Sequence, residues 1–380
     1  MAVVVYSFRR LDRTGAHMKS KILWWVIVGA LAVGLGFGAQ RLAIPGSWFV
    51  AAMIIAVITG LIRPAHPQVN KPVLMGAQAV IGTMLGINVR PDIFPLLLLH
   101  LPAIIGVISF TIAFCLVAAM VLPRISSLNR ETAAMGSLPG GASAMIALSI
   151  GTKADTRIVG LMQYLRMILV VLISSLVAKF LTYHVSTVGQ HVPRVSSVAI
   201  HGWYDYALMP LVAVAGVWIG RLIRLPAATL LGPMLLGLLI SIFHPFHPVW
   251  PLWVPPLVYI IMGFYVGLLF DRKSLNQAGR LLPLLITNVL VLIGFCALVG
   301  LVLSRLIDAS PLSGYLATSP GGGDTISIIA FGCGADVSLI FAVQIFRALV
   351  ILFTGPYLTK AILHITRKQS AQPSSTIDLT

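Results

Sequence analysis

Apolar runs long enough to cross a lipid bilayer recur along the whole chain. Residues 22–39, 96–122, 157–180 and 281–303 each approach or exceed the ~20 residues that a transmembrane helix needs. Such runs must be helical, because hydrocarbon offers the backbone no hydrogen-bond partners. Only 9% of the residues are charged, against roughly 25% in soluble domains, which fits a surface that faces lipid. We therefore predict an all-α integral membrane protein.

The net charge of +16 does not indicate a nucleic-acid-binding protein. The basic residues are dispersed between the apolar runs and form no stripe interleaved with aromatic side chains, so we expect no direct contact with nucleic acid. Cys115, Cys296 and Cys333 lie in apolar runs without metal-ligand spacing, and the histidines are scattered. We expect no metal or cofactor. The lipid bilayer is the expected partner, and a homodimer is compatible with the sequence.

The sequence contains an internal duplication. Residues 45–166 align with residues 226–347 without an insertion, at an offset of 181 positions. The matches that carry most weight are Pro139, Gly140, Gly141, Gln163 and Arg166 with Pro320, Gly321, Gly322, Gln344 and Arg347, respectively. Matches of proline, glycine and buried polar residues are not a by-product of an apolar composition. The chain is therefore built from two copies of one unit.

The duplication predicts the domain organisation. We place the first membrane unit at residues 19–185 and the second at residues 200–366. Residues 1–18 are expected to form an N-terminal extension, with Met18 as an alternative start. The polar tail 367–380 is expected to be disordered.

Each unit contains five clear helical spans and one ambiguous segment, residues 132–151 or 312–333, with Pro-Gly-Gly in its middle. The repeats are parallel if this segment crosses the membrane and inverted if it enters and returns. Returning segments leave 19 of the 26 Lys and Arg residues in cytoplasmic segments and five in external loops, whereas crossing segments give 15 and nine. The positive-inside rule favours the first division. We therefore predict about ten transmembrane helices plus two re-entrant hairpins in two inverted repeats.

The Pro-Gly-Gly breaks are the candidate binding site. Inverted-repeat transporters bind solutes near the midplane, where broken helices meet. Proline and glycine stop a helix, and the restarted helix offers unpaired N–H groups to an anion. A kinked helix or a surface loop would explain the same motif. The candidate residues are Ser137, Pro139, Gly140, Gly141 and Ser143 in the first unit, and Thr318, Ser319, Pro320, Gly321, Gly322 and Asp324 in the second.

Polar residues of the final helix in each unit complete the candidate site. Gln163 and Arg166 lie on roughly one helical face with an aspartate at the start of that helix, and Gln344 and Arg347 repeat the pattern. A guanidinium without a partner is costly in an apolar run. Each arginine is thus expected to balance an anionic solute or to bridge hairpin carbonyls. Asp324 is expected to face a cavity or to cap its own helix.

Other recurring residues have a packing explanation. Gly82-x-x-x-Gly86 and Gly263-x-x-x-Gly267 are patterns that let helices approach closely. Three amides, Gln78, Asn88 and Asn288, have no counterpart in the other half and are candidates to line a cavity.

The paired motifs resemble those of the AbrB family of bacterial membrane proteins. The motif LPGG…M at residues 138–145 and TSPGGxD…IIA at residues 318–330 carry the resemblance, which covers about residues 20–365. Gly323 stands where a bulkier residue is expected. The resemblance implies a multi-pass protein of the bacterial inner membrane, for which the basic residues predict cytoplasmic termini. Members of this family are labelled regulators of gene expression, and some ammonia monooxygenases.

Three functions follow from these observations. The inverted repeats and doubled breaks favour a secondary-transporter-like permease for a small solute, and the arginines and helix termini suit an anionic one. The alternative is a membrane regulator of gene expression that acts indirectly, since the sequence shows no DNA-binding domain. A monooxygenase needs a metal or cofactor, typically held by clustered histidines and carboxylates. The sequence shows no such cluster, so no enzymatic activity is expected.

Overall fold

The computed structural model describes residues 24–62, 68–89, 93–138, 152–186, 203–225, 227–243, 250–270 and 279–348, with isolated positions between and after these ranges. Every regular element in these ranges is helical, which confirms the all-α prediction. The predicted extension 1–18 and tail 367–380 lie outside the described residues.

The described helices of the two halves follow each other in a similar order. In the first half a helix over 24–41 precedes α2 (Ser47–Ile62), α3 (Lys71–Asn88), α4 (Ile93–Leu99), α5 (Leu101–Ile125), α6 (Arg130–Ser137) and α8 (Thr156–Ser186). The second half contains α9 (Trp203–Leu222), α10 (Ala228–Phe243), α11 (Val254–Leu268), η1 (Gly279–Leu281), α13 (Leu282–Leu306), α14 (Pro311–Thr318), α15 (Gly323–Cys333) and a helix over Val337–Ala348.

Among the residues that the structure describes, three stretches are long and apolar enough to cross a membrane by length and composition. They are Leu101–Ile125, Thr156–Thr182 and Gly279–Leu306. Six further apolar helices are shorter, among them α2, α10 and α11. The number of about ten spans stays a prediction.

The helices of the two halves begin and end at equivalent positions. Adding the sequence offset of 181 to the bounds of α2, α5 and α6 gives the bounds of α10, α13 and α14. The equivalent residues Phe114 and Phe295 stack on each other, with ring centroids 4.2 Å apart and planes inclined by 12°. A residue can touch its own equivalent only near the axis that relates the two halves. That axis therefore passes between α5 and α13.

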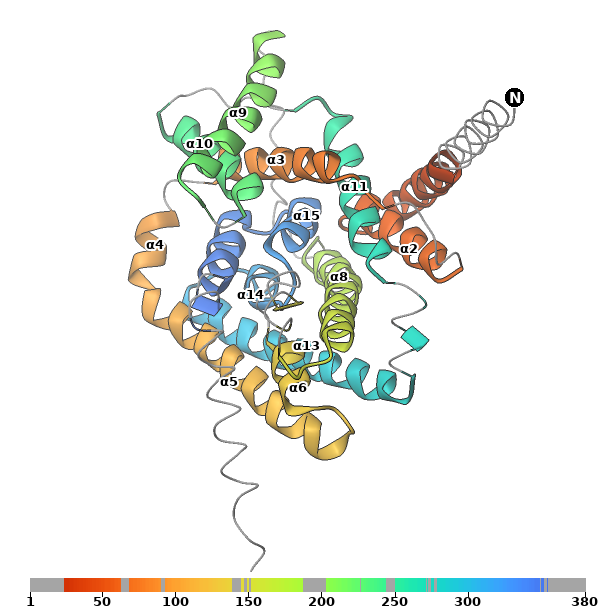
Figure 1. Cartoon of the computed structure of the whole chain (residues 1–380). Coiled ribbons are helices and arrows are strands. Elements are labelled where there is room, and N and C mark those ends of the chain that lie inside the picture. The colour runs from red at the N-terminus through yellow and green to blue at the C-terminus, as the bar shows by residue number, and fades with distance from the viewer. Residues whose placement is uncertain are drawn as a thin grey trace, which may run out of the picture.

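The two halves are intertwined rather than side by side. Helix α3 of the first half packs on α10 of the second, and α2 packs on α11 (Figure 1). Glycines make both contacts close: the places for Cβ atoms on Gly82 and Gly86 are filled by the carbonyl oxygens of Leu230 and Met234, and those on Gly263 and Gly267 by the equivalent carbonyls of Phe49 and Met53. The packing prediction for these glycines is confirmed.

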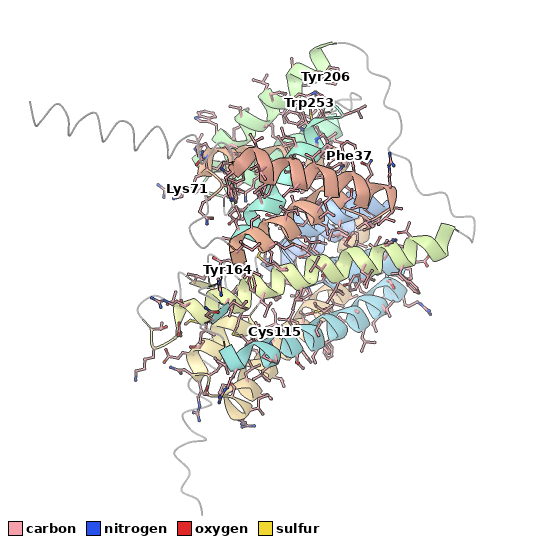
Figure 2. All side chains as sticks on the ribbon, turned by 90° about the vertical axis from the view of Figure 1, so that its right-hand side faces the viewer. Phe37, Lys71, Cys115, Tyr164, Tyr206 and Trp253 are labelled. Atoms are coloured by element: carbon pink, nitrogen blue, oxygen red, sulfur yellow. The ribbon has the colours of Figure 1, made fainter. Side chains whose placement is uncertain are left out.

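The short helices α14 and α15 lie in the middle of the molecule. They occupy the centre of Figure 1, with longer helices around them. Helix α14 packs on α13, and α15 packs on α8. Helices α8 and α13 also contact each other, and Figure 2 shows them one above the other. The helices of the second broken segment are thus surrounded by longer helices from both halves.

Candidate functional site

The broken segment of the second half turns back on itself. Ser310 begins α14, and its Oγ accepts a hydrogen bond from the N–H of Ser313 at 3.1 Å. After α15 the chain ends its helical course at Gly334, whose φ of 67° suits glycine. The N–H of Asp336 then donates to Ser313 Oγ at 2.9 Å. The end of the segment therefore lies beside its beginning, as a hairpin requires.

The first half repeats this closure with equivalent residues. Here the N–H of Asp155 donates to Thr132 Oγ1 at 2.8 Å. Two further bonds join the same ends: Lys153 N–H to Glu131 Oε2 at 2.7 Å, and Asn129 Nδ2 to the carbonyl of Lys153 at 2.8 Å. We call residues 130–155 hairpin 1 and residues 311–336 hairpin 2. Four of the predicted site residues of hairpin 1 lie outside the described residues: Pro139, Gly140, Gly141 and Ser143.

The tip of hairpin 2 is buried and held by hydroxyl groups. Residues 319–322, Ser-Pro-Gly-Gly, separate α14 from α15, as the sequence predicted. Thr318 Oγ1 donates to the carbonyl of Cys296 at 2.8 Å. Ser319 Oγ lies 3.3 Å from Ser174 Oγ on α8. Both tip side chains are less than 3% exposed. Neither hydroxyl is directed to an open space.

A glutamine anchors each hairpin in the same way. Gln163 Nε2 donates to the carbonyls of Met135 and Leu138 at 2.9 and 3.0 Å. The equivalent Gln344 Nε2 donates to the carbonyls of Leu316 and Ser319, each at 3.0 Å. The last carbonyls of a helix have no intrahelical partner. The two glutamines satisfy those carbonyls where α6 and α14 end.

Arg347 fixes the backbone of hairpin 2. Its Nη1 donates to the carbonyls of Thr318 and Ser319 at 3.0 and 2.9 Å, and its Nη2 donates to Gly321 O at 3.2 Å. Nη2 also donates to Gln344 Oε1 at 2.6 Å. The guanidinium is 5% exposed and surrounded by carbonyl oxygens. Of the two roles that the sequence left open, Arg347 takes the bridging one.

Arg166 does not repeat this arrangement, although it is the equivalent residue. Its Nη2 donates to Gln163 Oε1 at 2.6 Å, like Arg347. Its Nε and Nη1 have no hydrogen-bond partner within the described part of the chain, and the residue is only 5% exposed. Ser137 Oγ, 4% exposed, is also without a partner there. Buried polar groups in folded proteins are almost always bonded, so this cluster is unusual.

Both residues with unpartnered atoms line a small cavity. Its walls come from three helices: Ser137 on α6, Arg166 on α8 and Asn288 on α13 supply the polar groups. The other wall residues are Gly136, Met162, Leu285, Val289 and Leu292. In this conformation the cavity has room for about one water molecule. Two predicted site residues, Ser137 and Arg166, therefore lie at one cavity with Asn288, one of the three amides that have no counterpart in the other half.

The aspartates do not join the arginines. The exposed Asp155 Oδ1 accepts from the N–H of Arg157 at 3.0 Å, and Asp336 Oδ1 accepts from Leu339 N–H at 3.1 Å. Each of these two aspartates caps the helix that follows it. Its side chain therefore does not join the glutamine and arginine on one helical face, as the sequence spacing suggests. Asp324 Oδ1 accepts from Thr325 N–H at 2.9 Å, so it partly caps α15, the second of its predicted roles.

Two of the three amides that have no counterpart in the other half form hydrogen bonds away from the cavity. Gln78 Oε1 accepts from Thr229 Oγ1 at 2.7 Å across the α3–α10 contact. Asn88 Nδ2 donates to the carbonyl of Met84 in its own helix. Of the three, only Asn288 lines the cavity. Asn288 stands out in the sequence because it is a polar residue in an apolar run. The equivalent residue of the first half, Val107, is apolar.

The comparisons with known proteins agree on one family. The family of the transition state regulatory protein AbrB matches residues 48–363. The Escherichia coli (strain K12) protein named "Putative regulator AbrB" is 33% identical over 351 residues, covering 92% of this chain and 99% of the relative. The Bacillus subtilis (strain 168) protein named "Uncharacterized protein YhjN" is 24% identical over 373 residues, covering 93% of this chain and 96% of the relative. Since the match spans most of the chain and carries both hairpins, the chain belongs to the AbrB family.

Proposed function

We propose that this protein is a secondary-transporter-like permease of the bacterial inner membrane that binds a small solute at its hairpin tips. The observation that carries the proposal is the pair of equivalent hairpins, each closed at its ends by a hydroxyl-to-backbone bond and anchored near its tip by a buried glutamine. Broken helices at matching places in two repeats are the typical solute site of such proteins.

The surface of the long helices supports a membrane location. Phe110 on α5, Leu176 on α8 and Leu298 on α13 are 66%, 68% and 65% exposed. A soluble protein rarely leaves large apolar patches open to water, whereas lipid accepts them without cost. These three helices are also the ones long and apolar enough to span a bilayer.

The hairpin closure supports inverted repeats. A segment that returns to its starting level does not cross the membrane, so a unit with five other predicted spans crosses it an odd number of times. Consecutive units with an odd number of spans enter the membrane from opposite sides. The 19-to-five division of Lys and Arg residues favours the same orientation, with both termini in the cytoplasm. The two hairpin tips then approach the midplane from opposite faces.

The polar tips favour a solute over a purely structural role. Charged side chains inside a membrane are costly and usually face a cavity, an ion or a partner group. Arg347 has its partner groups in hairpin 2, but Arg166 does not have them in the described part of hairpin 1. Packing alone does not explain an arginine in that state.

A reconstitution experiment tests the proposal. We expect the purified chain in liposomes to take up at least one small organic anion from a radiolabelled panel, above protein-free liposomes. Arg166→Gln should abolish this uptake, because it removes the charge at the cavity, whereas Arg221→Gln at the exposed end of α9 should not. A folded protein that moved no member of the panel would contradict the proposal.

Indirect regulation of gene expression is the second candidate function, because the Escherichia coli relative is named "Putative regulator AbrB". It predicts a dedicated cytoplasmic partner that co-purifies with the chain. A stable complex with such a partner, combined with no uptake in liposomes, would favour regulation over transport.

A further inference from the structure

The cavity beside hairpin 1 has the chemistry of an anion site. We propose that it binds the carboxylate of a small aliphatic acid, with Arg166 as the charge partner and Ser137 and Asn288 as hydrogen-bond donors. The proposal specifies the solute of the proposed function and rests on it.

The first argument is the uncompensated charge. Nε and Nη1 of Arg166 carry three of the five N–H donors of the guanidinium, and none of the three has a partner among the described residues. No carboxylate in the described part of the chain is bonded to this arginine. Burying a charge without a counter-charge is unfavourable. A bound anion removes that cost and supplies acceptors for the free donors.

The second argument is the contrast with the other half. Arg347 is equivalent to Arg166, but its N–H groups point to three hairpin carbonyls. The hydroxyl of Thr318, the residue equivalent to Ser137, donates a hydrogen bond to the carbonyl of Cys296. The position equivalent to Asn288 is the buried Val107. The three equivalent side chains in the second half are therefore bonded to the protein or apolar, and we assign the site to hairpin 1 alone.

The third argument concerns the class of anion. A carboxylate suits a guanidinium together with a hydroxyl and an amide, because its two oxygens accept several hydrogen bonds. The remaining walls, among them Met162, Leu285 and Leu292, are apolar and suit a short alkyl chain. The cavity holds about one water molecule in this conformation, so the alkyl chain must be short and the cavity must widen to admit it.

A binding assay on the purified full-length chain tests the site. We expect acetate, propionate and butyrate to raise the unfolding temperature in a concentration-dependent manner, because a ligand stabilises the state that it binds. The neutral amides acetamide and propionamide match these acids in shape and should give no shift. Sodium chloride and sodium sulfate at equal ionic strength separate a carboxylate site from a general anion site.

Three variants assign the shift to the cavity. Arg166→Gln should abolish it, and Ser137→Ala and Asn288→Val should each weaken the apparent affinity about tenfold, the effect of one lost charge-assisted bond. Asn288→Val copies the residue of the other half, so it should fold like the parent chain. Arg221→Gln, on the surface, should keep the full shift.

The outcomes separate the site from the transport proposal. A carboxylate shift that depends on Arg166, without uptake in liposomes, supports the site and contradicts transport. Uptake of an organic anion that survives Arg166→Gln contradicts the site and leaves transport standing. An equal shift with chloride, or no carboxylate shift with a folded parent chain, overturns the carboxylate proposal.

Discussion

Arg347→Met is expected to destabilise the protein severely, by roughly 3–5 kcal/mol. The substitution removes the side-chain donor from the carbonyls of Thr318 and Gly321, leaves Gln344 as the side-chain donor to the carbonyl of Ser319, and removes the donor to Gln344 Oε1. All of these groups are near the centre of the molecule, where water does not replace a lost partner. The measurement is the unfolding temperature in a mild detergent, with the folded yield after size-exclusion chromatography as a second readout.

Arg166→Met is the matched control, because it makes the same chemical change at the equivalent position. Removing Arg166 deletes a buried charge with two unpartnered nitrogens, and Gln163 keeps its bonds to hairpin 1. We expect its stability to lie within about 1 kcal/mol of the parent chain in the absence of solute. Equal losses for the two variants would show that Arg166 is structural, like Arg347, and would remove the charge that the cavity needs.

Gly86→Ala is expected to push α3 away from α10 and to lower the unfolding temperature strongly. A Cβ at this position would lie 2.1 Å from the carbonyl oxygen of Met234 on α10. Both atoms belong to rigid helix backbones, so the contact cannot be relieved by a change of rotamer. Overpacking of this kind costs about 1–3 kcal/mol even where side chains can adjust. The same variant should also reduce the yield of folded protein.

Gly76→Ala on the same helix is the control for this prediction. No heavy atom lies within 4 Å of the place of its Cβ, and alanine favours a helix by about 1 kcal/mol over glycine. We therefore expect Gly76→Ala to leave the unfolding temperature unchanged or to raise it slightly. If Gly86→Ala behaved like Gly76→Ala, the close approach of α3 and α10 would be incorrect.

The duplication allowed much of the fold to be predicted from sequence. The offset of 181 residues anticipated that α2, α5 and α6 would have exact equivalents, because both copies carry the same helix signals. Asn129 and Ser310 are different residues, yet both begin a short helix by accepting a backbone N–H. Charge counting then favoured a returning segment, and the bonds that close the hairpins agree with it.

The difference between the two halves could not be predicted in this way. Arg166 and Arg347 are identical residues at equivalent positions, so any argument from the repeat assigns them one role. Their roles differ because the carbonyls of hairpin 2 reach Arg347, whereas Nε and Nη1 of Arg166 have no partner in the described part of the chain. Such differences depend on which residues of the other half lie near each hairpin, here residues of α13 that line the cavity with Ser137. The cavity residue Asn288 comes from that packing.

The central claim is that the two hairpins enter the membrane from opposite faces and return. Two equivalent pairs of exposed residues flank them: Arg124 and Asp155 around hairpin 1, and Arg305 and Asp336 around hairpin 2. Each is replaced singly by cysteine, and the variants are labelled with a membrane-impermeant maleimide in intact spheroplasts and in inverted vesicles. The native cysteines Cys115, Cys296 and Cys333 are buried, so the parent chain serves as the unlabelled control.

We expect both members of the first pair to react only in inverted vesicles and both members of the second pair only in intact spheroplasts. A pair whose two members reacted from opposite faces would show that its segment crosses the membrane. Two pairs that reacted from the same face would show that the repeats are parallel. Either result would contradict the paired hairpins and the solute site built on them.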